Sequence, residues 1–232
     1  MCQITIMLIC PHCSSSGVVK NGIKSTGKQN FQCKDCTKQF QAEYQNKGAD
    51  PKQRQRVVAM LLHNSGIRDI ESVIGMSRRT ILSILLACGG VRLIPRHRSY
   101  RSVQIDEIWS YVGTKKRKRW LLYAYAPESD EVLAFVCGSR SRATVRKLYQ
   151  ALKHLHITEF CTDHWKAFQG VFPSERHSIG KSFTRQIEGV NTSIRARNRR
   201  FVRKTCCFSK KIQNHDAAIA MMFAYRNGYH TF

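Results

Sequence analysis

Acidic residues are scarce in this chain, and one of them lies where a strand is expected. The sequence has 15 Asp and Glu against 39 Lys and Arg, and Asp106 lies inside the β-prone run from Val103 to Gly113. A carboxylate in mid-strand is disfavoured by β-propensity and by the cost of burying its charge. Alternation puts Asp106 and Ile108 on one face of the strand and Glu107 on the other. A compensating partner is required, and a metal ion would serve.

Two further carboxylates are candidates to act with Asp106. Asp163 stands just past the strand expected over 157–161, and the carboxyl end of a strand is where open α/β sheets build their sites. Glu188 is the one acidic residue in 181–211, a stretch that holds ten Lys or Arg. Taken alone, Glu188 could equally be a salt-bridge partner for that positive charge.

Together the three carboxylates suit phosphodiester chemistry. Two divalent ions roughly 4 Å apart can activate the nucleophile and stabilise the leaving oxygen. Mg²⁺ prefers hard oxygen ligands and keeps some of its waters, so the three carboxylates and a scissile phosphate could hold the pair, with Mn²⁺ as a substitute. Asn191 and Arg195 share a helical face with Glu188. We assign these two residues and Arg199 to contacts with DNA.

A second chemical signal is a set of paired cysteines. The pattern C-x₂-C-x₁₉-C-x₂-C is formed by Cys10, Cys13, Cys33 and Cys36. Its spacing is typical of a structural zinc site, in which four thiolates surround Zn²⁺ at about 2.3 Å. A module this short cannot bury enough surface to fold alone, so metal binding would supply the folding energy. Phe31 and Phe40 are candidates for its small core.

The other cysteines follow no metal-binding pattern, and most are expected to be small buried apolar residues in a reducing cytoplasm. They are Cys2, Cys88, Cys137, Cys161, Cys206 and Cys207.

The segment between the cysteines and Asp106 predicts three helices. Apolar residues recur at helical spacing in 54–63 and in 67–74, where Ile67, Ile70, Val73 and Ile74 form one stripe. A break at Gly75 and Met76 precedes Ser77, which can cap a third helix over 78–86.

This arrangement indicates a helix-turn-helix, with an ordinary three-helix spacer as the alternative. The third helix would direct Arg78, Arg79 and Thr80 towards the major groove of DNA. Its apolar residues would face the core: Ile81, Ile84 and Leu85.

The remainder of the chain predicts a mixed α/β domain. Three strand-like runs, 103–113, 120–126 and 132–137, are separated by basic or turn-forming segments, which favours two hairpins in a meander. A helix over 142–155, a strand over 157–161 and helices near 183–200 and 212–225 follow. The basic hairpin segment supplies further candidates for contact with the DNA backbone: Lys115, Lys116 and Arg117.

Net charge points to the partner. A formal charge of +24 and a pI near 10.1 are costly in a compact protein unless a polyanion is bound. No uncharged apolar run is long enough to span a membrane, and the apolar start lacks the marks of a secretion signal. We therefore expect a cytoplasmic, nucleoid-associated protein that binds double-stranded DNA and no membrane.

The chain resembles transposases of the insertion sequence 1 family, within the DDE transposases of RNase H-like fold. The resemblance extends over nearly the whole chain. Besides the cysteine pairs and the helix-turn-helix it includes the motifs at 105–113, 119–124, 162–165, 184–188 and 207–210.

This resemblance implies that Asp106, Asp163 and Glu188 are the catalytic triad, and Arg195 matches a basic residue that follows the family's glutamate. Such enzymes bind the inverted ends of their element, nick them and join the freed 3′ hydroxyls to target DNA. Since two ends must be held together, a homodimer or larger assembly is expected.

The expected architecture has three parts: a zinc ribbon over 1–47, a helix-turn-helix domain over 48–98, and an RNase H-like catalytic domain with a mixed sheet over 99–232. Two other functions remain open from the residues. One is a DNA-binding repressor with an inactive nuclease-like domain, and the other is a different RNase H-like nuclease.

Overall fold

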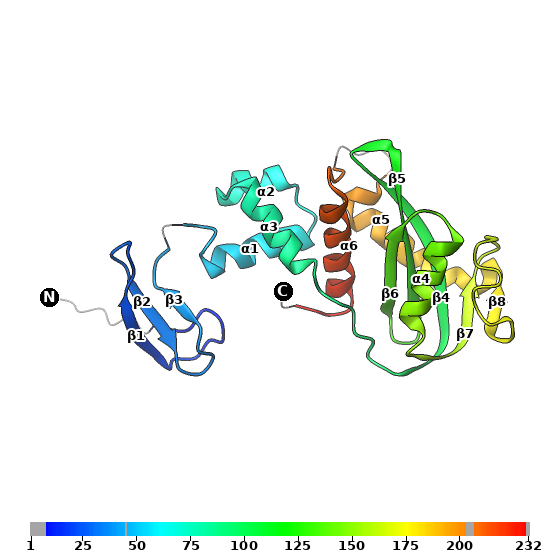
Figure 1. Ribbon diagram of the computed structural model, residues 1–232, viewed down its shortest axis with the longest axis horizontal. Coiled ribbons are helices and arrows are strands. Elements are labelled where there is room, and N and C mark those ends of the chain that lie inside the picture. The colour runs from blue at the N-terminus through cyan, green and yellow to red at the C-terminus, as the bar shows by residue number, and fades with distance from the viewer. Residues whose placement is uncertain (1–7, 45, 203–206, 231–232) are drawn as a thin grey trace. The chain divides into compact units, whose positions relative to one another are not determined.

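A computed structural model (Figure 1) describes residues 8–44, 46–202 and 207–230. Cys2 and Cys206 lie outside the described residues. The chain forms two compact units: residues up to Met60 with Ile67–Ile84, and Leu61–Gly66 with Leu85–Phe232. The three-part division given by the sequence stays a prediction.

The N-terminal cysteines lie around a small antiparallel sheet. Its strands are β1 (Val18–Ile23), β2 (Gln29–Cys33) and β3 (Gln39–Gln41), in the order β1-β2-β3. Phe31 lies opposite Phe40 in the ladder, and their rings stack with centroids 5.9 Å apart. With the buried Cys10 and Cys33 they form the core of this module, as the sequence predicted.

Three helices follow, at the positions that the apolar periodicity predicted: α1 (Pro51–Leu62), α2 (Ile67–Ile74) and α3 (Arg78–Cys88). The side chain of Ser77 accepts a hydrogen bond from the backbone N–H of Thr80 at 3.3 Å, which confirms the expected cap. Ile81 is fully buried. The expectation for Val73 was wrong, because its side chain is 70% exposed while Ile70 and Ile74 are buried.

A five-stranded mixed sheet forms the larger part of the second unit. Its strands are β4 (Ser99–Val112), β5 (Thr114–Ala126), β6 (Glu131–Gly138), β7 (His156–Thr162) and β8 (His177–Ile179). They lie in the order β6-β5-β4-β7-β8. Strands β4, β5 and β6 form an antiparallel meander, whereas β7 is parallel to β4 and β8 is parallel to β7. The mixed sheet was predicted, and the short strand β8 was not.

The basic segment 115–119 lies inside β5, not between two strands. The turn from β4 is made at Gly113, whose φ of +77° suits glycine. Partners on β4 hold the charged residues in the ladder, with Tyr111 opposite Lys118 and Trp109 opposite Trp120. Weak β-propensity is thus overridden by cross-strand pairing.

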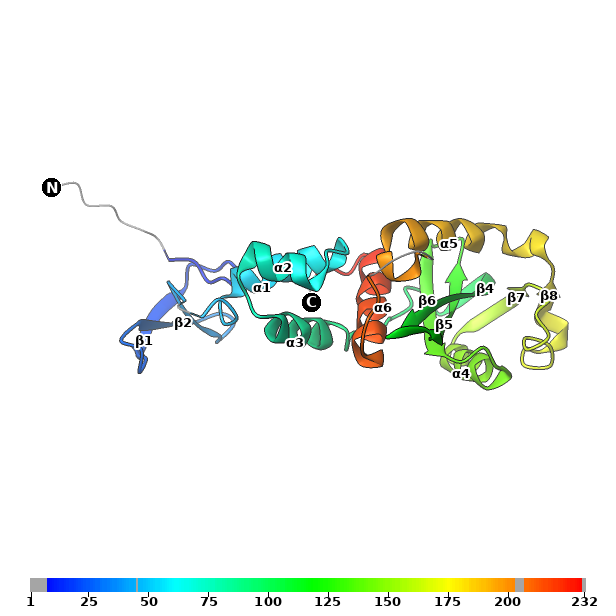
Figure 2. The same cartoon turned by 90° about the horizontal axis from the view of Figure 1, so that it is seen from above.

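Helices cover both faces of the sheet, as Figures 1 and 2 show. Helix α4 (Arg142–Leu152) packs Val145, Leu148 and Leu152 against one face, which confirms the predicted stripe. On the other face, α5 (Arg185–Arg197) and α6 (Ile212–Arg226) pack with the sheet in a second core, to which Ile187 and Phe223 belong. Side chains on opposite faces of β4 therefore belong to different cores. Ile105 belongs to the core on the α4 side, and Ile108 belongs to the core on the α5 side.

Short 3-10 turns complete the chain: Ser174–Arg176, Lys181–Thr184 and Arg199–Phe201. Among the described residues, no helix is long and apolar enough to cross a bilayer.

Candidate active site and zinc site

The parallel pairing of β4 with β7 places Asp106 beside Asp163. Gln104 lies opposite Cys161, and each aspartate lies two residues further along its strand. Neighbouring strands are about 4.8 Å apart, so the two carboxylates emerge at adjacent positions. One ligand oxygen from each, together with one from Glu107, lies within 4.8 Å of the others.

Asp106 is held in place by hydrogen bonds. The backbone N–H of Glu107 donates to Oδ1 at 2.8 Å, and the side-chain amide of Asn191 donates to Oδ2. Asn191 is itself oriented by the Tyr123 hydroxyl, which donates to its Oδ1 at 2.7 Å. Asn191 is buried and both its polar atoms form hydrogen bonds within the protein. The sequence predicted that Asn191 contacts DNA, whereas in the structure its side chain contacts Asp106.

Asp163 begins the loop that leaves β7. The backbone N–H of Trp165 donates to its Oδ1 at 2.9 Å, which closes a local turn. This turn keeps the carboxylate at the end of the strand, where the sequence placed it.

Glu107 is a site residue that the sequence reasoning missed, because strict alternation put it on the opposite face from Asp106. Its side chain is only 6% exposed, and the Arg140 guanidinium contacts its Oε1 at 2.6 Å through Nη2 and at 3.0 Å through Nε. Arg140 in turn stacks between two indole rings, 5.0 Å from the Trp120 centroid and 4.6 Å from that of Trp165. The scarcity of acids in the chain was the signal that could have drawn attention to Glu107.

Glu188 does not join this cluster in the structure. It is exposed in the first turn of α5, and no ligand atom of its side chain belongs to the metal-capable groups found among the described residues. It precedes Asn191 by three residues, so the two lie on neighbouring parts of one helical face. Arg195, one turn beyond Asn191, is exposed and close enough to Asp106 to act on its pKa.

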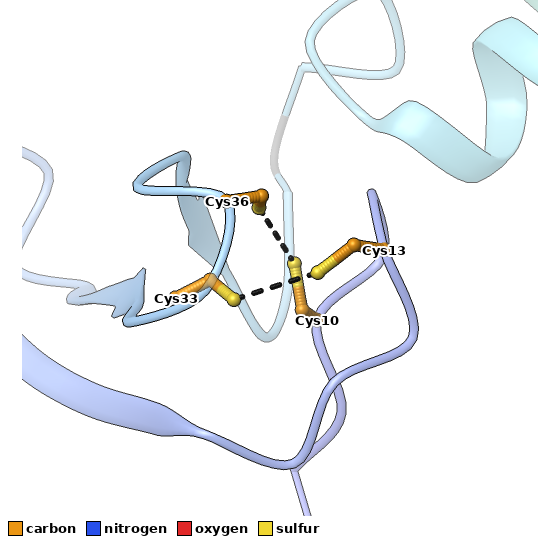
Figure 3. A group of neighbouring side chains, drawn as sticks. All are labelled: Cys10, Cys13, Cys33 and Cys36. Carbon is orange, nitrogen blue, oxygen red and sulfur yellow. Dashed lines mark hydrogen bonds between the residues drawn. The ribbon is translucent and has the colours of Figure 1, made fainter.

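The four N-terminal cysteines converge on one point, as Figure 3 shows. Their sulfur atoms lie within 4.8 Å of one another, with Cys10 Sγ 3.6 Å from Cys36 Sγ and Cys13 Sγ 3.5 Å from Cys33 Sγ. Tetrahedral thiolates at about 2.3 Å from Zn²⁺ would be about 3.8 Å apart. Backbone hydrogen bonds, that from Cys36 foremost, lower the pKa of Cys33 to about 6. The backbone hydrogen bond with Ser15 acts to lower the pKa of Cys13, but burial and the neighbouring cysteines outweigh it and raise that pKa.

The candidate DNA-contacting residues are mostly exposed. Arg78 forms an ion pair with Glu71 at 2.8 Å, whereas Arg79 is exposed at the start of α3. Thr80 bonds Ser77 at the helix cap, with 2.9 Å between the hydroxyl oxygens. The remaining candidates are exposed on β5 and on the turn after α5: Lys115, Lys116, Arg117 and Arg199.

Comparison with known proteins matches both parts of the chain. A family model described as IS1 transposase matches residues 101–229, the region of the carboxylates. The chain belongs to the IS1 transposase family. A second model, the InsA N-terminal domain of the zinc-ribbon type, matches residues 1–37.

Individual relatives agree with this assignment. The insertion element iso-IS1n protein InsB of Shigella dysenteriae is 39% identical over 116 residues, which are 50% of this chain and 88% of that protein. The insertion element IS1 2 protein InsB of Escherichia coli strain K12 is 37% identical over 116 residues, 50% of this chain and 70% of the relative. The insertion element IS1 protein InsB of Shigella flexneri is 37% identical over 116 residues, which are 50% of this chain and 88% of that protein.

The predicted family is therefore confirmed, and the protein is a DNA transposase, an enzyme that cleaves and transfers DNA. Its N-terminal module is a zinc ribbon, and the four converging cysteines support a structural zinc site. Membership of this family implies DNA binding. The C-terminal mixed sheet has the strand order and helical layers of an RNase H-like fold.

A third group of metal-capable side chains in the transposase is a structural network. His215 and Asp216, near the start of α6, lie close to Cys137 on β6. His215 is buried, with its Nε2 2.6 Å from the Ser110 hydroxyl and its Nδ1 3.2 Å from Asp216 Oδ1. Asp216 also forms an ion pair with Arg119. These bonds tie α6 to β4 and β5 and occupy both ring nitrogens of His215 and the carboxylate of Asp216.

The carboxylate cluster makes the stability of the transposase depend on pH. Burial raises the pKa of Asp106 and that of Glu107 above the ordinary carboxyl values. A raised pKa means that the folded protein holds the proton more tightly than the unfolded chain. Ionised Asp106 therefore lowers folding stability at neutral pH, and this loss disappears as the pH falls through the raised pKa.

We expect Asp106→Asn to raise the melting temperature at neutral pH in divalent-free buffer, because the removal of a buried charge outweighs the loss of one of the two hydrogen bonds that Asp106 accepts. The gain should shrink as the buffer is acidified, since the wild-type carboxyl then becomes neutral. Asp130 is the matched control, because its pKa is lowered: its partial burial is outweighed by hydrogen bonds from Arg226 and Tyr125. Asp130→Asn should lower the melting temperature. A lower melting temperature for Asp106→Asn at pH 7 would contradict this account.

Proposed function

We propose that this transposase uses Asp106, Asp163 and Glu188 as its catalytic carboxylates, with Mg²⁺ or Mn²⁺ as the cofactor. It binds the inverted-repeat ends of its element, cleaves a phosphodiester at each end and transfers the freed strand to target DNA. The observation that carries this proposal is the parallel register that places Asp106 beside Asp163 with ligand oxygens within 4.8 Å.

The donor set fits a hard divalent cation. Carboxylate oxygens that lie within 4.8 Å of one another repel each other when ionised, and a cation between them would remove that repulsion. Asp106 and Asp163 would be ligands, and Glu188 would complete the set from α5. Bound divalent ions activate the attacking oxygen and stabilise the leaving oxygen.

The chain's own residues prepare this chemistry. Asn191 fixes the orientation of Asp106 through the hydrogen bond from its amide. Glu188 lies in the preceding helical turn, and to complete the set its exposed side chain would have to turn towards the same site. Arg195 and Arg199 are exposed and would bind the phosphates that flank the cleaved bond.

DNA recognition is assigned to α2 and α3 as a helix-turn-helix, with α3 in the major groove. The turn at Gly75, which has φ +69°, and the capped start of α3 support this assignment. The basic stretch of β5 would add sequence-independent phosphate contacts through Lys115, Lys116 and Arg117.

The arginines at the start of α3 give a direct test of this assignment. We expect an Arg78→Ala, Arg79→Ala double variant to lose about 1–3 kcal/mol per base contact on the element's ends and to relax base preference there. A Lys115→Ala, Lys116→Ala double variant should instead weaken binding to DNA of every sequence to the same extent and reduce the salt dependence of binding. Footprints and affinities on end and scrambled DNA would be compared. An unchanged footprint in the arginine variant would show that another element reads the bases.

The same proposal covers assembly and location. Two ends must be held together during transfer, so the active form would be a homodimer or a larger assembly. Its DNA partner would place the protein in the cytoplasm on the nucleoid.

The proposed reaction is tested by incubating the full-length, zinc-loaded protein with the genomic DNA that flanks its gene. Nicks should appear at the ends of the element when Mg²⁺ or Mn²⁺ is present. Nicks scattered without regard to the ends would instead favour a general nuclease, and binding without any cleavage would favour a repressor.

A further inference from the structure

Glu107 has a carboxylate oxygen that the contacts of the protein leave unsatisfied. Both contacts from the Arg140 guanidinium go to Oε1. The other oxygen, Oε2, is buried and has no hydrogen-bond partner in the part of the chain that the structure describes. Leaving a buried charged oxygen unpaired is expensive, so a fold that keeps it requires another partner for that atom.

The position of Glu107 indicates which kind of partner its Oε2 atom would have. Its carboxylate lies in the same cluster as those of Asp106 and Asp163, with ligand atoms within 4.8 Å. No described donor of the protein reaches Oε2, and Arg140 contacts only Oε1. The chemistry that three neighbouring carboxylates share is the binding of a divalent cation.

Arg140 fixes where the free oxygen lies. Its guanidinium is stacked between Trp120 and Trp165, which limits its movement. Because it holds Oε1 in two contacts, the carboxylate plane of Glu107 cannot turn freely. Arg140 therefore acts as a positioning residue, and it also offsets part of the negative charge of the cluster.

We propose that Glu107 is a further carboxylate ligand of the divalent-ion centre, which it contacts through Oε2 while Arg140 holds Oε1. This inference rests on the proposed function, since it assigns a fourth carboxylate to the same metal site. The rival explanation is a structural ion pair that ties β4 to the segment before α4 and has no part in metal binding.

Mn²⁺ binding to the full-length, zinc-loaded protein distinguishes these explanations without any measurement of activity. We expect Glu107→Gln to weaken Mn²⁺ affinity about tenfold or more, by analogy with the loss of residues around other metal sites. Arg140→Gln keeps the carboxylate ligand; it frees the carboxylate plane but also removes a nearby positive charge, and because these two effects oppose each other the affinity should stay within about threefold. Titration calorimetry and the electron paramagnetic resonance of bound Mn²⁺ would report both values.

The number of water molecules on bound Mn²⁺ separates a ligand from a nearby charge. Loss of a direct ligand should add a water to the ion in the Glu107→Gln protein, whereas loss of charge alone should not. Electron–nuclear double resonance in ¹⁷O-labelled water counts these waters. An unchanged water count in Glu107→Gln would overturn the proposal even if the affinity fell.

Asp163→Asn is the reference variant that distinguishes failure of the proposal for Glu107 from failure of the proposed metal centre. If Asp163→Asn loses Mn²⁺ and Glu107→Gln binds it as the wild type does, the proposal for Glu107 is wrong and the proposed metal centre stands. If both variants bind Mn²⁺ as the wild type does, the metal centre itself is wrong and both inferences fall.

A variant that removes the ion pair as a whole covers the case in which Glu107→Gln does not fold. Breaking one partner of a buried pair leaves an uncompensated charge, whereas removing both often does not destabilise. The Glu107→Gln, Arg140→Gln double variant should fold and show the same loss of Mn²⁺ affinity. Wild-type affinity in this folded double variant would overturn the proposal.

Discussion

Asp106→Asn, Asp163→Asn and Glu188→Gln should each abolish cleavage and strand transfer while DNA binding survives. Each change removes one negative charge and nearly keeps the shape of the side chain. Loss of one metal ligand should cost several kcal/mol of transition-state stabilisation, which is about a thousandfold in rate for about 4 kcal/mol. Single-turnover nicking of labelled element ends would measure this loss. DNA affinity should hold or rise, since repulsion from phosphate falls.

The matched control is Glu128→Gln, which changes an exposed carboxylate in the turn between β5 and β6. It should cut at the wild-type rate. If the three carboxylates were only salt-bridge partners, activity would fall only in step with thermal stability. A well-folded Glu188→Gln protein that cuts at the wild-type rate would remove Glu188 from the catalytic set. This outcome is informative because the Glu188 side chain is exposed and apart from the cluster.

The metal dependence gives a second readout on the same prediction. Mn²⁺ should replace Mg²⁺ in cleavage. Ca²⁺ should support DNA binding better than turnover, because its looser coordination holds the substrate less strictly.

Removing zinc should unfold the N-terminal module and leave the rest of the chain folded. The module has a core of few residues around Cys10, Cys33 and Phe40, so its folding must be coupled to metal binding. Apparent binding free energies of structural zinc are about 10–16 kcal/mol near neutral pH, far more than such a core supplies. Elemental analysis should find one Zn²⁺ per chain, and amide exchange after chelation should show loss of protection over β1, β2 and β3.

Cysteine variants provide the control for this prediction. Cys36→Ser should lose zinc and reproduce the effect of chelation, whereas Cys161→Ala should keep it, because Cys161 is buried on β7 and is not one of the four converging cysteines. Carefully purified protein that folds normally without zinc would refute the zinc site.

Local sequence signals placed most elements, because they depend on neighbours along the chain. The apolar stripe of α4 and the cap of α3 were both predicted, and both are formed. Errors arose where contacts between distant residues decided the outcome. Lys118 was expected between strands, yet its pairing with Tyr111 holds it within β5. Val73 fits the periodicity of a buried stripe but is exposed, since three helices offer only a limited buried area.

By itself the sequence predicted the kind of chemistry that this transposase performs and the residues that could carry it. The spacing of its cysteines defines a zinc ligand set, and the scarcity of acids singles out Asp106, Asp163 and Glu188. These predictions could be made without a structure because ligand type and short spacings are properties of the chain alone.

Only the tertiary structure decided which of these groups meet. The register of β4 against β7 brings Asp106 to Asp163, although 56 residues separate Asp106 from Asp163 in the sequence. The packing of α5 on the sheet brings the side-chain amide of Asn191 into hydrogen-bond contact with Asp106. The segment before α4 brings Arg140 to Glu107, with which it forms an ion pair. Such contacts depend on how strands align and which face each helix covers, and no local pattern encodes that alignment.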